Sequence, residues 1–134
     1  MKCLVVTPEE TVFDREVSFV VLPLFDGEYA VGRDHTPVIG RLGAGELRST
    51  LQDGSIERWY VEGGFVEVVD NFVTLLTNVA VPLSSLDATK AQNELDEAME
   101  LRATSDEEAR VKDDKLRVAR SKLRAAQKGA KITK

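Results

Sequence analysis

The sequence has little of the chemistry that enzymes and metalloproteins use. Of its 134 residues, only Cys3 is a cysteine and only His35 is a histidine. A single cysteine cannot form an internal disulfide, which fits a reducing compartment, and this pair cannot supply the usual ligands of a zinc site. Cys3 stands in an apolar run at the start of the chain, so we expect it to be a buried residue of a first strand.

The sequence also lacks the motifs of common catalytic and nucleotide-binding loops. Phe25–Arg48 holds five glycines, one proline and His35 between two strand-like runs. It contains no GxxxxGK[ST] phosphate loop and no GxGxxG that leads into a helix. The chain has no nucleophile elbow and is short for an enzyme with a concave site. We therefore expect a noncatalytic protein; an enzyme would need a pocket around His35.

Long apolar runs are missing as well. No run approaches the ~20 residues that a membrane-spanning helix needs. The first residues look like a strand rather than a signal or transit peptide. We therefore expect the protein to begin here and to remain in the compartment where it is made.

Charge is distributed unevenly along the chain. Residues 1–109 carry 8 basic and 21 acidic side chains, a net charge of −13. Residues 110–134 carry 10 basic side chains against Asp113 and Asp114, a net charge of +8. A basic tail on an acidic body indicates a negatively charged partner, which could be nucleic acid, a membrane surface or an acidic protein.

The pattern of apolar residues changes near Pro82. Before it, short segments rich in β-branched and aromatic residues are separated by turn signals, which is typical of a sandwich or barrel. The expected strands cover residues 15–24, 27–31, 45–52, 55–64, 65–69 and 72–81, in addition to the first strand. Asp53-Gly54 predicts a type I′ hairpin, and Val69–Phe72 is a weaker signal of the same kind.

After Pro82 the period becomes helical. Ser84 is the expected N-cap of a first helix, with Asp87 three residues on. Ser105 is the expected cap of a second helix, with Glu108 reaching back and Gly129 as its stop. The apolar stripes of both helices consist mostly of alanine. We predict an α+β protein: an antiparallel β-sandwich (residues 1–83), then an antiparallel two-helix hairpin (residues 84–134) that is marginally stable alone.

Three segments, taken in order, resemble one known family. They are "GEYAVGRDHTPVIGRLGAGELR", "YVEGGFVEVVDNFVTLLTNVA" and "LDATKAQNELDEA". Together they resemble the epsilon subunit of the F-type ATP synthase, in its bacterial and chloroplast branch. One departure is Val31-Gly32, because many members carry the glycine one position earlier. The resemblance covers nearly the whole chain.

The resemblance implies a noncatalytic subunit at the foot of the central stalk, which turns with the gamma subunit and the membrane ring of c subunits. The Gly-rich segment is then a docking surface, whose glycines permit tight loops. By resemblance, the expected c-ring contacts are Glu28, Arg33, Asp34 and His35, and the expected gamma contacts are His35, Thr36, Pro37 and Val38.

The resemblance also gives the two helices a role. In the family they fold against the sandwich or extend toward the catalytic alpha and beta subunits, where they inhibit ATP hydrolysis. The expected contacts to beta are Arg117, Arg120, Lys122 and Arg124. Some members bind ATP on the folded hairpin; Asp87 matches their motif, but Lys90 replaces its arginine, so we expect at most a weak ATP site, with no other cofactor and no metal.

The resemblance implies a hetero-oligomer bound peripherally to the cytoplasmic face of a bacterial plasma membrane, with a thylakoid membrane as the second choice. The alternative function is that of a small nucleic-acid-binding β-barrel with a basic helical tail. The acidic body and the lack of basic-aromatic interleaving in its strands argue against nucleic acid as a partner.

Overall fold

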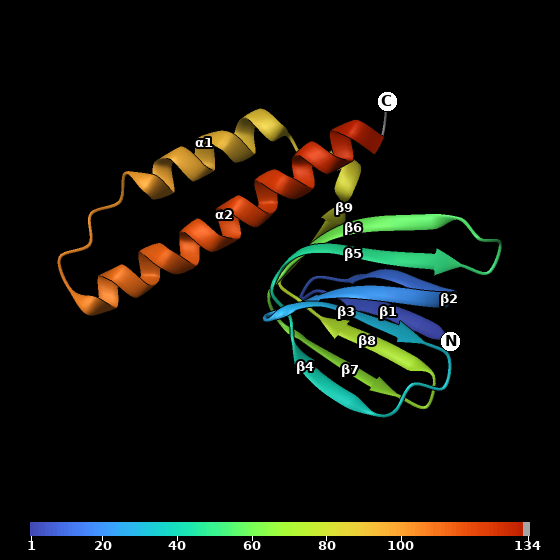
Figure 1. Ribbon diagram of the computed structural model, residues 1–134. Coiled ribbons are helices and arrows are strands. Elements are labelled where there is room, and N and C mark those ends of the chain that lie inside the picture. Colours follow the sequence, from blue (N-terminus) through green and yellow to red (C-terminus); the bar gives the residue numbers. More distant parts are fainter. Residues whose placement is uncertain (133–134) are drawn as a thin grey trace. The chain divides into compact units, whose positions relative to one another are not determined.

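The structure is a computed structural model that describes residues 1–132 (Figure 1). The chain divides into two compact units, Met1–Pro82 and Leu83–Lys134. The first unit consists of strands and the second of helices. The predicted class, a mainly antiparallel β-sandwich followed by two helices, is confirmed.

The first unit consists of two sheets that share one long strand. Its nine strands are β1 (Lys2–Val6), β2 (Thr11–Leu24), β3 (Gly27–Gly32), β4 (Val38–Arg41), β5 (Ala44–Leu51), β6 (Ile56–Glu62), β7 (Phe65–Val69), β8 (Phe72–Leu76) and β9 (Val79–Pro82). The first half of β2 pairs with β1, and its second half pairs with β3 and β5. One sheet therefore has the order β4-β7-β8-β1-β2, and the other β3-β2-β5-β6-β9.

The core lies between the two sheets and is formed by alternate residues of the strands, as the period of two requires. In β1, β7 and β8 the inward residues are fully or almost fully buried. Cys3 is among them, which confirms its expected place in a first strand. The core side chains are Met1, Cys3, Val5, Phe13, Val17, Val20, Leu22, Val31, Leu42, Leu47, Leu51, Val61, Val66, Val68, Val73 and Leu75.

One strand was not predicted from the sequence, and one predicted strand was wrong. Strand β4 lies inside the Gly-rich segment, where its four residues were too few to show a period. Residues 72–81 form two strands in different sheets, β8 and β9, because the chain changes sheets at Thr77. The buried Thr77 hydroxyl donates to the carbonyl of Val79 (3.1 Å), and its N–H bonds Val6 O (3.0 Å). One strand pair, β1 with β8, is parallel.

The two hairpin signals had different outcomes. Asp70 and Asn71 both have positive φ (49° and 62°), as a type I′ turn requires. At Asp53-Gly54 the I′ prediction was wrong, because only Gly54 has positive φ (89°). The Gly54 N–H donates to the carbonyl of Leu51 (3.0 Å). This bond closes a type I turn whose last residue is a left-handed glycine.

The second unit begins with a short 3₁₀ segment, η1 (Leu83–Ser85), followed by α1 (Ala88–Met99) and α2 (Asp106–Ile132). The expected N-cap Ser84 was wrong, because Ser84 belongs to η1. The Asp87 carboxylate caps α1 by accepting from the N–H groups of Thr89 and Lys90 (2.9 and 3.2 Å). Asp87 stands directly before the helix, so its carboxylate reaches these donors, whereas the Ser84 hydroxyl lies three residues earlier.

The predicted start of α2 is confirmed. The Glu108 N–H donates to the Ser105 hydroxyl (3.1 Å), and the Glu108 carboxylate accepts from the N–H and hydroxyl of Thr104 (3.0 and 3.1 Å). These bonds to Thr104 lower the pKa of Glu108. Because the cap needs the charged carboxylate, it is retained above the ordinary glutamate pKa and weakens as the pH falls through the lowered value.

The predicted end of α2 was wrong, because Gly129 lies inside the helix. A Cβ at this position would lie 2.7 Å from the carbonyl oxygen of Leu83. Glycine is therefore needed at this position because α2 approaches η1 closely, and not because the helix ends there. The interface within the unit is alanine-rich as predicted, with Ala91, Ala98, Ala119, Ala125 and Ala126 buried.

Candidate functional site

Glu28 lies at the start of β3, next to the β2–β3 turn, and joins a chain of ion pairs. Its carboxylate is 3.1 Å from the Arg48 guanidinium. Arg48 also contacts Glu46 (2.8 Å), and Glu46 contacts Arg58 (3.2 Å). The Glu46 side chain is only 8% exposed, so its charge needs these partners. The hydrogen bond that Arg48 donates to Glu46 raises the pKa of Arg48, so the guanidinium stays charged and can hold Glu28 in place.

Arg33, Asp34 and His35 follow the other end of β3. The His35 Nδ1–H donates to the carbonyl of Thr36 (2.6 Å), because a carbonyl oxygen can only accept. In the neutral ring, Nε2 then accepts from the Tyr29 hydroxyl (2.8 Å), and the two rings also pack edge to face. His35 therefore has a structural role in holding the loop against β3.

The structure separates two groups of residues that were expected to share one partner. Glu28 and Arg33 stand at opposite ends of β3, five residues or about 16 Å apart. In contrast, His35, Thr36, Pro37 and Val38 are continuous with the edge strand β4. The residues expected to contact the c ring are thus divided between two places, whereas the residues expected to contact gamma lie together.

The outer face of the β4-β7-β8-β1 sheet carries apolar side chains that were not singled out from the sequence. Across three pairings Arg41, Phe65, Leu76 and Val6 form one row. Each of the large apolar residues Ile39, Phe65, Phe72 and Leu76 is more than half exposed. We call these four residues the apolar face. Large exposed apolar side chains on one face of a sheet indicate a protein interface.

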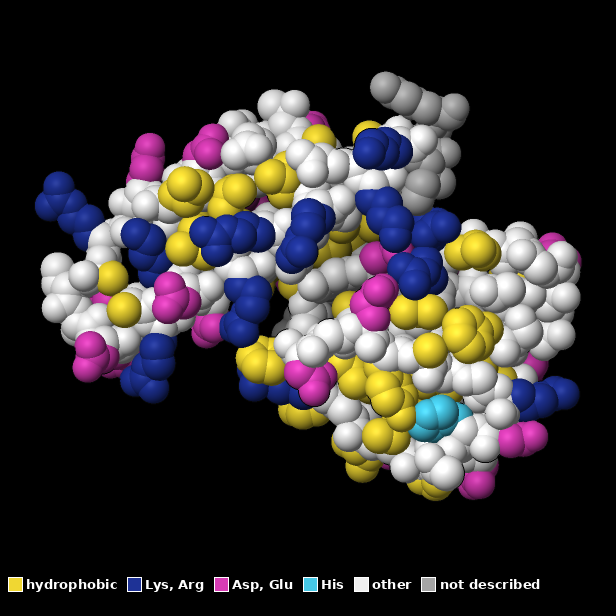
Figure 2. Space-filling model, viewed as in Figure 1, with side chains coloured by type: hydrophobic (Ala, Val, Ile, Leu, Met, Phe, Trp, Pro, Cys, Tyr) yellow, Lys and Arg dark blue, Asp and Glu magenta, His cyan; other side chains and the backbone are white. Residues whose placement is uncertain are grey.

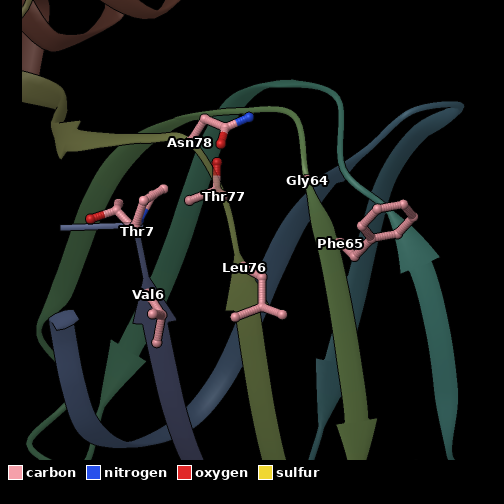
Figure 3. A pocket seen from close by; sticks show the side chains of 8 residues that line it. Val6, Thr7, Gly64, Phe65, Leu76, Thr77 and Asn78 are labelled. Carbon is pink, nitrogen blue, oxygen red and sulfur yellow. The ribbon is translucent and has the colours of Figure 1, made fainter. Parts of the chain in front are cut away.

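A sequence signal for this face did exist. "FVEVV" and "FVTLL" place apolar residues at outward as well as inward positions, a pattern of strands covered on both sides. Three residues of this row, Phe65, Leu76 and Val6, also line a hollow of about 390 Å³ (Figure 3). Its lining consists of Val6, Thr7, Pro8, Gly64, Phe65, Leu76, Thr77 and Asn78.

The four basic residues expected to contact beta do not share one face of α2. Arg117, Arg120 and Arg124, at spacings of three and four, lie on one exposed side. Lys122 points toward α1, where its Nζ is 3.1 Å from Glu94 Oε2. Figure 2 shows Lys and Arg side chains along the hairpin. The exposed basic side is therefore narrower than the sequence implied.

The two candidate ATP residues meet at the start of α1. The Asp87 carboxylate is occupied by the N–H groups of Thr89 and Lys90, while the Lys90 side chain is exposed. A carboxylate at this end would repel a triphosphate.

The structure also bears on the chemistry of the remaining side chains. Burial raises the pKa of the Cys3 thiol to about 12, so the thiol stays protonated and is a poor nucleophile. Within residues 1–132 no three His, Cys, Asp or Glu side chains come together as a metal site would require. No helix in this part of the chain is both long and apolar enough to cross a bilayer.

Comparison with known proteins identifies the family. Residues 1–83 match the family model described as "ATP synthase, Delta/Epsilon chain, beta-sandwich domain". The chain belongs to this family. An ATP synthase epsilon chain of Rhodopirellula baltica is 46% identical over 84% of this chain and 87% of its own length. One of Delftia acidovorans is 43% identical over 72% of this chain and 70% of its own.

Solved structures show the same fold at low identity. One chain of the mitochondrial ATP synthase of Euglena gracilis has a TM-score of 0.81 at 24% identity, covering 93% of this chain and 79% of its own. One in the central stalk and c-ring structure from Tetrahymena thermophila has a TM-score of 0.75 at 14% identity, covering 94% and 96%.

The family confirms the resemblance read from the sequence. The chain is a noncatalytic subunit of the ATP synthase, a membrane-associated complex. The alternative of a nucleic-acid-binding barrel has no support from these comparisons.

Proposed function

We propose that the chain is a central-stalk rotor subunit that joins the gamma subunit to the c ring and restrains ATP hydrolysis. The observation that carries the proposal is the match of the whole sandwich, residues 1–83, to the delta/epsilon-chain family. Residues 1–83 form the binding domain and residues 84–134 the regulatory hairpin. The complex lies on the cytoplasmic face of a bacterial plasma membrane; a thylakoid membrane is the second choice.

The proposed gamma surface combines His35, Thr36, Pro37 and Val38 with the apolar face. Val38 begins β4 and packs partly against the core, whereas Ile39 follows it on the exposed outer surface. Burying these side chains stabilises a complex by roughly 25 cal/mol per Å². Gamma is the partner best suited to this surface because an apolar face needs a partner that stays bound throughout rotation.

The proposed c-ring contact is Glu28. Arg33, Asp34 and His35 were expected beside it, but they lie at the other end of β3, so we place them on the gamma side. The Glu28 carboxylate is exposed yet held by Arg48 at 3.1 Å, which reduces the entropy that docking on a polar loop would cost.

The proposed contacts of the hairpin with beta are Arg117, Arg120 and Arg124, which share the exposed side of α2. Lys122, the fourth candidate, must first leave Glu94. This pair is only partly buried, so screening by solvent limits its contribution to about 1 kcal/mol and it holds the hairpin weakly. Acidic side chains of beta could then compete for Lys122.

A truncation tests the proposal. We expect residues 1–85 to fold and to bind gamma, because the core side chains all come from residues 1–75. In the assembled enzyme the truncation should raise ATP hydrolysis about twofold or more, since the inhibitory helices are gone. Size-exclusion binding and ATPase rates at matched assembly measure the two effects. Loss of gamma binding would refute the docking role, and unchanged hydrolysis would refute the inhibitory one.

ATP binding by the hairpin is expected to be poor. Lys90 offers a point charge instead of a planar fork, and the neighbouring Asp87 carboxylate is held at the helix start. We predict a dissociation constant in the millimolar range or no binding, about −4 kcal/mol or less favourable. Isothermal titration of the full chain with ATP measures it. A micromolar constant would show that Lys90 and the arginines of α2 suffice.

A further inference from the structure

A pair of reciprocal hydrogen bonds joins two turns that lie far apart in the sequence. The Asp34 N–H donates to Asn71 Oδ1 (2.7 Å), and Asn71 Nδ2 donates to Asp34 Oδ1 (3.0 Å). Asp34 belongs to the connection between β3 and β4, and Asn71 to the β7–β8 turn. Both turns lie at the same end of the sandwich as the N-terminus (Figure 1). We call this pair of bonds the clasp.

The clasp supports a backbone conformation that Asp34 does not favour by itself. Asp34 has φ of 60°, in the left-handed region that side-chain-bearing residues seldom adopt. The bonds of His35 reach only Tyr29 and Thr36, six residues and one residue away. The clasp spans 37 residues, so it ties the connection to the sheet that carries the apolar face.

The clasp also fixes the segment that leads into the gamma surface. Residues 33–37 connect β3 to β4 and are mostly exposed. An exposed connection that is ordered before binding loses less conformational entropy when a partner docks. Pro37 restricts its own φ, but the position of Asp34 depends on Asn71.

We propose that Asn71 is a positioning residue for gamma binding, and that the β7–β8 turn forms part of the gamma surface. This inference rests on the proposed function. Asn71 acts through Asp34: it holds residues 33–37 so that Pro37 and Val38 enter β4 in the orientation that gamma recognises. The same turn begins β8, which carries Phe72 and Leu76 of the apolar face.

The neighbouring residue provides a matched control. Asp70 occupies the same turn with φ of 49°, but within residues 1–132 its side chain makes no hydrogen bond or ion pair. Glycine accepts positive φ, so Asn71→Gly and Asp70→Gly both preserve the turn. Only Asn71→Gly removes the clasp, and the main-chain bond from Lys2 N to Asn71 O (2.9 Å) is kept.

The experiment compares the full chain and both variants by binding to purified gamma and by amide hydrogen exchange. For Asn71→Gly we expect faster exchange at residues 34–36 and binding to gamma weakened about five- to tenfold. For Asp70→Gly we expect neither change. The double variant Asp34→Asn with Asn71→Asp exchanges donor and acceptor, so it should restore both readouts toward the wild type.

The outcomes separate this inference from the proposed function. If wild type binds gamma and the two glycine variants bind equally well, or are weakened equally, Asn71 has no positioning role. Faster exchange in Asn71→Gly without weaker binding overturns the inference too. Failure of the wild-type chain to bind gamma refutes the proposed function, and the inference with it.

Discussion

Replacing Gly64 with alanine is expected to destabilise the sandwich by about 3 kcal/mol or more. Gly64 connects β6 to β7 with φ of 103°, where a side chain is strained. A Cβ there would collide with the carbonyl oxygen of Leu76 and lie 2.9 Å from Thr77 Cα. These are backbone atoms at the point where the chain changes sheets, so the clash cannot be relieved by a rotamer change.

The displacement would spread to bonds that join the sheets. The Gly64 carbonyl accepts from the N–H of Leu42 (2.8 Å), and the Thr77 hydroxyl bonds Glu62 O (3.3 Å). Gly64 and Leu76 also line the hollow that adjoins the apolar face, so gamma binding should fall as well.

The adjacent glycine is the control for this prediction. Gly63 also has positive φ (71°), but a Cβ there meets nothing within 4 Å. Gly63→Ala should therefore lower the free energy of unfolding only by the cost of holding alanine at positive φ, about 1 kcal/mol. Urea unfolding followed by the fluorescence of Trp59, the only tryptophan, reports on the sandwich alone. Equal losses in the two variants would contradict the clash as the cause.

Replacing Gly129 with alanine is expected to weaken the folded hairpin and to lower ATP hydrolysis by the assembled enzyme. Two effects act in the same direction. The Cβ would lie 2.7 Å from Leu83 O and 3.2 Å from Leu83 C, which pushes α2 away from η1. Alanine also stabilises an isolated helix by about 1 kcal/mol relative to glycine, which favours a detached α2.

A combined shift of about 2 kcal/mol would change the balance between folded and detached hairpins roughly 30-fold. Amide exchange of residues 125–131 in the full chain should show the loosened packing, and ATPase assays should show stronger inhibition. Gln127→Ala, at an exposed position nearby, is the control and should change neither. Hydrolysis that is unchanged or faster in Gly129→Ala would contradict an inhibitory role for the detached helix.

Features that depend on neighbouring residues could be predicted from the sequence. The change of period near Pro82 separated strands from helices. Apolar residues recur every two positions in strands and about every 3.6 positions in helices, so their order along the chain distinguishes the two. Ser105 and Glu108 were correctly assigned to a helix start, since capping bonds reach only three or four residues. The place of Cys3 in the core followed from its apolar neighbours in the first strand.

The family resemblance was likewise carried by the order of short segments, so the sequence alone was sufficient to identify an ATP synthase epsilon chain. The arrangement of the proposed docking residues was harder to predict from the sequence. Glu28 and Asp34 are close in sequence, yet an intervening strand carries them to opposite ends of the sandwich. Asp34 instead meets Asn71, and no local pattern indicates that pairing.

By itself, then, the sequence determined the class of fold, the division near Pro82, the helix start at Ser105 and the family. Only the tertiary structure decided that residues 72–81 cross between sheets, that Lys122 pairs with Glu94, and that Gly129 continues a helix beside Leu83. The physical reason is the distance along the sequence over which each interaction acts. Periodicity and caps are set by residues within about one turn or one strand, whereas register, crossing points and close approaches depend on which distant backbone atoms come together when the core closes.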